Sequence, residues 1–146
     1  DFPVNVEVVD GGTQGQTLLT FVERADRLLV LDAVDFGLEP SAILLRDNVP
    51  AYLTAQKIGP HQNSFSEVMG LAALRGTAPA HCALIGVQPA AMTLAAPLST
   101  PVSESFDEAQ SMALDILRQW GVAPSLRAQS RHLSAAVLDT LAQSYA

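Results

Sequence analysis

Asp32 and His61 are the residues of this chain whose types and positions could do chemistry. Asp32 directly follows the apolar run at residues 28–31, which predicts a strand, and His61 precedes residues that predict a helix. Open α/β folds bind ligands at the carboxyl ends of their strands, so two such residues from separate elements can meet there. A carboxylate and an imidazole at one edge would suit a divalent metal or an acid/base pair.

Each of these two residues also has a structural interpretation. An Asp that ends a buried strand often only caps the following loop, and a lone His at a helix start is more often a surface or capping residue than a ligand. Two protein ligands are also fewer than the three usual in a catalytic metal site. The residues alone therefore leave a metal site and a structural role both open. Asp35 is a further carboxylate that could help at the same edge.

The turn Asp10-Gly11-Gly12-Thr13 is a second candidate site. Its backbone amides could meet a substrate strand or an anion, but two glycines after a strand commonly form only a tight turn. The chain contains neither a phosphate-binding loop with Lys nor a Gly-x-Ser-x-Gly sequence. Nucleotide binding and serine catalysis are therefore disfavoured, and no catalytic residue is assigned.

Apolar periodicity predicts the elements that would position these residues. The pattern predicts a strand at residues 4–9, a helix bearing Leu18, Leu19 and Val22, and a strand at 28–32. Together they would form a βαβ unit, and the unbroken apolar run of the second strand predicts burial on both of its faces. If a strand at 42–45 neighbours the strand at 28–32, the connection is too short for a parallel crossover, and the strand is expected to be antiparallel. Further predicted elements are a helix that His61 opens and Gly76 ends, a strand at 81–87 and a loop at 90–102. A last helix runs up to Gly121, and either Ser103 or Ser105 can cap its start, with Ser105 and Glu108 forming a capping box.

Composition excludes several classes of function. The 146 residues fit one domain. The net charge of −7, without a basic cluster, argues against nucleic acid or anionic lipid as a partner. No stretch approaches the roughly 18 apolar residues of a membrane span, so membrane insertion is not expected. The single cysteine, Cys82, lies in an apolar stretch, and we expect it to pack in the core of a protein from a reducing compartment, the cytoplasm.

Four separated stretches carry most of these features. They read VEVVDGGTQG at residues 6–15, LDAVDFGLEP at 31–40, HQNSFSEV at 61–68 and LIGVQP at 84–89. In content, order and spacing, over residues 1 to about 122, they resemble the [NiFe]-hydrogenase maturation protease family. The HQNSFSEV stretch is most similar to the subgroup that processes membrane-bound uptake hydrogenases. The resemblance divides the chain into a maturation-protease-like domain at 1–122 and a tail with an amphipathic helix at 123–146.

The resemblance implies an endopeptidase that removes the C-terminal extension of the hydrogenase large-subunit precursor after nickel insertion. In that family the nickel meets an acidic residue near the N-terminus, an Asp at a strand end and a His at a helix start, and the last two match Asp32 and His61. The turn at 10–13 would contact the precursor tail. The ion would be Ni²⁺ carried by the precursor, or another divalent metal in its place. Such an ion can polarise a scissile carbonyl, so no nucleophilic side chain is required.

The implied fold is a three-layer α/β/α sandwich around a mixed, mostly parallel sheet. Residues 1–146 do not include that fold's first strand and helix or the N-terminal acidic ligand, so we expect this stretch by itself to be inactive. Either the strands at 4–9 and 28–32 close on each other, or a segment outside residues 1–146 takes the vacant place. The alternative function is a flavodoxin-like module that binds a partner or an ion at Asp32 without cleavage.

Overall fold

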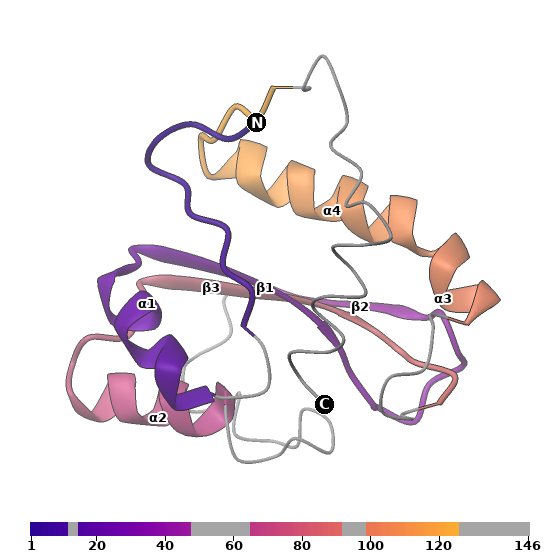
Figure 1. Cartoon of the computed structure of the whole chain (residues 1–146), viewed down its shortest axis with the longest axis horizontal. Coiled ribbons are helices and arrows are strands. Elements are labelled where there is room, and N and C mark those ends of the chain that lie inside the picture. Colours follow the sequence, from indigo (N-terminus) through magenta and orange to yellow (C-terminus); the bar gives the residue numbers. More distant parts are fainter. Residues whose placement is uncertain (12–14, 48–64, 92–98, 126–146) are drawn as a thin grey trace, which may run out of the picture.

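A three-stranded mixed sheet is the central feature of the chain in the computed structural model (Figure 1). The strands lie in the order β1 (Arg27–Ala33), β3 (His81–Val87) and β2 (Ile43–Arg46). The middle strand, β3, pairs parallel with β1 and antiparallel with β2. The predicted antiparallel direction of the strand at 42–45 is therefore confirmed, but β3 lies between it and β1, so the two are not neighbours. The structure describes residues 1–11, 15–47, 65–91 and 99–125.

Helices cover both faces of this sheet, which gives the α/β/α layers that the sequence predicts (Figure 1). On one face lie α1 (Leu19–Arg24) and α2 (Phe65–Leu74), and on the other lies α4 (Phe106–Gln119). Side chains alternate along β3, so Cys82 packs toward the first face and Ile85 toward α4. The two buried clusters consist of Val22, Val68, Met69, Ala72 and Cys82, and of Ala83, Ile85, Ala113 and Ile116.

The helix boundaries depart from the predictions at one place. The predicted loop at 90–102 is wrong at its end, because α3 (Thr100–Glu104) begins there with Pro101 in its first turn, where a missing amide hydrogen has no cost. The Ser105–Glu108 capping box is also absent. Ser105 has helical backbone angles, and its hydroxyl donates to the carbonyl of Val102 at 2.9 Å instead. Within the described ranges, no helix combines the length and apolar character that a membrane span requires.

Residues 4–9 do not form the predicted strand. The N-terminal residues make other contacts instead: the Asp1 ammonium donates to the Ser125 carbonyl at 2.7 Å, and Glu7 forms an ion pair with Arg24. Neither contact supplies the row of backbone partners that a strand needs. The predicted βαβ unit is therefore wrong, and the two N-terminal strands do not close on each other.

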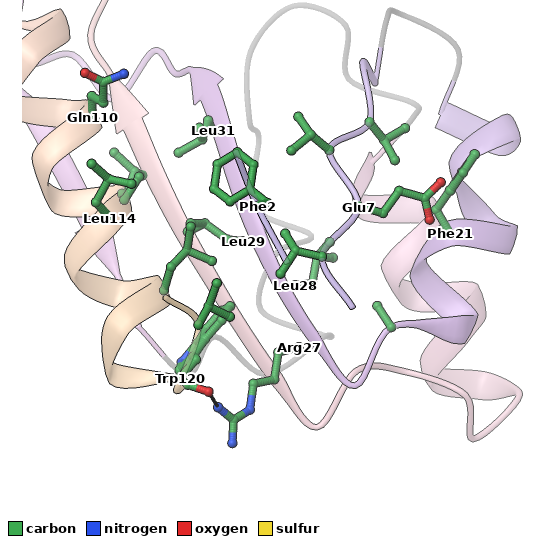
Figure 2. Close-up of a pocket in the computed structure, with 18 of the residues that line it drawn as sticks. Phe2, Glu7, Phe21, Arg27, Leu28, Leu29, Leu31, Gln110, Leu114 and Trp120 are labelled. Carbon is green, nitrogen blue, oxygen red and sulfur yellow. Dashed lines mark hydrogen bonds between the residues drawn. The ribbon is translucent and has the colours of Figure 1, made fainter. Parts of the chain in front are cut away.

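An open groove lies where those two strands would have met (Figure 2). It has a volume of about 1160 Å³ and runs between the N-terminal segment, the outer edge of β1 and α4. Phe2, Leu29 and Leu114 are among its apolar side chains. Leu31 is 63% exposed, so the expectation that β1 is buried on both faces is wrong. In the described parts of the chain, β1 pairs with β3 alone.

Cys82 is buried, as the sequence predicts, and its burial makes a testable contribution to stability. Only 5% of its surface is exposed, and burial raises the pKa of its thiol from 9.0 to about 11. Between about pH 9 and 11 the unfolded chain loses this proton while the folded chain keeps it, so the free energy of unfolding falls as pH rises through that window. We expect urea titrations at pH 8 and pH 10.5 to show this loss. The Cys82→Ala variant should lose less stability between the two pH values, and an equal loss in both proteins would contradict the assignment.

Candidate active site at the carboxyl end of β1

Asp32 lies where the sequence analysis placed it, next to the last residue of β1. Its backbone is in register with Gly86 of the parallel neighbour β3, so the carboxyl ends of both strands share one edge of the sheet. Asp32 is exposed there, and its Oδ1 accepts a hydrogen bond of 2.8 Å from the amide of Ala33. A carboxylate at this edge can reach a group carried on another molecule.

The segment that follows Asp32 is fixed by Gln88, which the sequence analysis did not single out. Gln88 is only 6% exposed. Its Oε1 accepts hydrogen bonds from the amides of Phe36 at 2.9 Å and Leu38 at 3.2 Å. Its Nε2 donates to Oδ1 of Asp35 at 3.1 Å, and the same oxygen accepts from the amide of Gly37 at 3.2 Å. Asp35, expected as a possible helper at the edge, therefore has a structural role within this turn.

Close packing joins the same segment to β3. Val34 is 1% exposed and lies directly over Gly86, where the absence of a side chain makes room for its branched methyl groups. The amide of Val34 donates to the carbonyl of Val87 at 3.0 Å. At the far end of the segment, Ser41 has a φ of 74°, which is rare outside glycine, and its amide donates to the carbonyl of Gln88 at 2.9 Å.

The other predicted site residues are only partly within the described structure. Asp10 is exposed, and Gly11 is half-buried with Leu18 beside it. Gly12, Thr13 and His61 lie outside the described residues, as does the predicted tail helix beyond residue 125. The pairing of Asp32 with His61 and a substrate role for the turn at 10–13 therefore remain predictions.

The donor set at this edge bears on the metal hypothesis. In the ranges that the structure describes, no group of three or more His, Cys, Asp and Glu side chains could hold a metal ion. Asp32 would thus need further donors, from His61 or from the molecule that carries the ion. A single exposed carboxylate fits an ion delivered on a partner better than one that the described residues hold by themselves.

Comparison with known proteins matches this arrangement to one family. A family model described as hydrogenase maturation protease matches residues 1–116. The hydrogenase expression/formation protein HupD of Bradyrhizobium diazoefficiens is 42% identical over 144 residues, covering 94% of this chain and 75% of that protein. The chain belongs to the hydrogenase maturation protease family. The Hydrogenase 2 maturation protease of Escherichia coli is 33% identical over 123 residues, covering 82% of this chain and 74% of that protein.

Solved structures agree with this family membership. The chain superposes on the hydrogenase maturating endopeptidase HybD from E. coli with a TM-score of 0.76 and 28% identity, covering 84% of this chain and 76% of HybD. A second endopeptidase from E. coli gives a TM-score of 0.77 at 28% identity, covering 89% of this chain and 82% of that one. The chain spans between 59% and 75% of the length of the HupD relatives that it matches.

Proposed function

We propose that the protein carrying this chain is the endopeptidase that removes the C-terminal extension of a [NiFe]-hydrogenase large-subunit precursor, and that it acts once nickel is in place. The single observation that supports this most is the position of Asp32, an exposed carboxylate at the carboxyl end of β1 in a fold shared with maturation endopeptidases. The proposal places the reaction in the cytoplasm, in keeping with the buried and reduced Cys82.

The chemistry assigned to each residue follows from its donor atoms. Asp32 contributes a carboxylate oxygen and His61 an imidazole nitrogen toward the nickel of the precursor, which is part of the substrate. An ion held by such donors can act as a Lewis acid on a carbonyl oxygen or activate a bound water. The turn at 10–13 would guide the precursor tail past that edge. The protein then positions the substrate, and no side-chain nucleophile is needed.

Mass spectrometry of the precursor tests this proposal. The full-length protein is mixed with nickel-loaded and with nickel-free large-subunit precursor, and the intact mass of the precursor is followed over time. We expect only the loaded precursor to lose its C-terminal extension, and the His61→Ala variant to leave it intact. Equal shortening of both precursors would exclude nickel recognition. Binding of the loaded precursor without any shortening would favour the partner-binding module instead.

A further inference from the structure

We propose that Gln88 is a positioning residue for precursor processing, because its side-chain amide fixes the turn after β1 and thereby holds the carboxylate of Asp32 in one place. The inference rests on the proposed function, since it assigns Gln88 a part in that reaction. Gln88 belongs to the LIGVQP stretch at the end of β3, a motif to which neither Asp32 nor His61 belongs.

The side chain of Gln88 is buried, and both ends of its amide form hydrogen bonds. Its oxygen accepts from two amides, those of Phe36 and Leu38, and its nitrogen donates to the carboxylate of Asp35. A buried polar group that lost such partners would be costly to desolvate, so the turn and the side chain hold each other in place. These partners lie fifty or more positions earlier in the chain, so the contact joins two distant segments.

The same turn also contains backbone strain. Ser41 occupies a left-handed conformation that costs a residue other than glycine free energy, and such residues persist only when their surroundings determine them. The surroundings here are the backbone of Gln88, which accepts from Ser41 at 2.9 Å and donates to the carbonyl of Ala42 at 2.9 Å. Gln88 therefore binds the turn at its middle through the side chain and at its end through the backbone.

The backbone connects this turn directly to Asp32. Only Ala33 separates Asp32 from Val34, whose amide bonds to Val87 and whose side chain lies against Gly86. Asp32 is thus at one end of a segment that hydrogen-bonds to Val87 and Gln88 and packs on Gly86, the last three residues before Pro89. If the turn loosens, the carboxylate loses its fixed direction, and a misplacement of about 1 Å in a reacting group can cost about a hundred-fold in rate.

The chemistry of an amide explains why glutamine suits this position. One end of the side chain must accept from backbone amides while the other donates to a carboxylate, and glutamine offers both. A glutamate at 88 would keep the acceptor but would place a second carboxylate against Asp35. Replacing Asp35 with Asn at the same time would remove that repulsion. An Asn nitrogen that donates to the glutamate at 88 would take the place of the oxygen that accepts from the amide of Gly37, so this second change restores one contact and loses another.

The hydrogen bonds between Gln88 and the turn can be tested with variants of the full-length protein. Gln88→Glu should lower kcat for the nickel-loaded precursor by at least about ten-fold and change KM by less than two-fold, because substrate binding elsewhere is unaffected. The double variant with Asp35→Asn should recover part of that loss, because the repulsion between the two carboxylates is gone. Gln88→Met, which removes every side-chain hydrogen bond at similar volume, should lower kcat similarly. Ser105→Ala, which removes a hydrogen bond from another buried polar side chain, is the matched control and should process normally.

Hydrogen exchange provides a measurement that does not depend on processing. The amides of Phe36 and Leu38 should exchange at least about ten-fold faster in Gln88→Met than in the parent, while those of β3 keep their protection. Wild-type kcat in both Gln88 variants, or a loss that only follows the fraction unfolded, would overturn the proposal. Failure of the parent to shorten any precursor would refute the proposed function, whereas unchanged exchange at these two amides would refute the role of Gln88 alone.

Discussion

Replacing Asp32 with Asn is expected to lower the rate of precursor processing by about a hundred-fold or more. Removing even the indirect partners of metal ligands typically costs about 10- to 100-fold, so loss of a direct carboxylate ligand should cost at least as much. Asn keeps the shape and can still accept from the amide of Ala33, so the fold should tolerate it. The rate is measured from the intact mass of nickel-loaded precursor over time, and the free energy of unfolding should stay within about 0.5 kcal/mol of the parent.

The control for this change is Asp107→Asn. Asp107 is also exposed and also loses one negative charge on substitution, but it lies in the first turn of α4, on a different element. We expect Asp107→Asn to process the precursor at the parental rate. Equal rates for Asp32→Asn and Asp107→Asn would remove Asp32 from the site, and the metal hypothesis would lose its described ligand.

Replacing Gly86 with Ala is expected to destabilise the fold by about 1–3 kcal/mol or more. A Cβ at this position would overlap Cγ2 of Val34 and lie 3.0 Å from its Cγ1. Val34 cannot easily turn away, because a β-branched side chain is stiff at χ1 and this one is 1% exposed. Urea unfolding followed by circular dichroism measures the loss.

Two further variants separate overlap from a general effect of adding a methyl group. Gly70→Ala in α2 meets no atom within 4 Å and should stabilise the protein by about 0.5–1 kcal/mol, the usual gain in a helix interior. Val34→Ala combined with Gly86→Ala should recover part of the loss, because the added methyl then has space. If Gly86→Ala is as stable as the parent, the close approach of Val34 to β3 is not a constraint on this fold.

The parts of the fold that were predictable are those whose apolar pattern is complete within one segment. Val68, Met69 and Ala72 fall on one face of α2, and Ala113 and Ile116 on one face of α4, so their periodicity alone fixes these helices. The strand at 4–9 has the right alternation and still does not form. A strand also depends on a partner for its backbone groups, and that partner is not encoded in the alternation itself.

Of the candidate site, Asp32 could be predicted from the sequence, but the residue that holds its segment in place, Gln88, could not. Asp32 could be located because the end of an apolar strand marks the binding edge of an α/β sheet. Gln88 could not be assigned a role, because its partners, Asp35, Phe36 and Leu38, become its neighbours only when the chain folds. The available signal was a glutamine between a buried strand and a proline, and that sequence is compatible with many roles.

The central place of β3 has a consequence for the order in which the chain can acquire its structure. During synthesis β1 and β2 leave the ribosome first, yet both pair with β3, and Arg27 meets its partner only when His81 has been made. Such non-local pairing slows folding, and it leaves the apolar strands β1 and β2 unpaired until β3 is available. A nascent chain arrested before residue 81 has left the ribosome should therefore be digested readily by protease, and one arrested after residue 87 has left it should begin to resist.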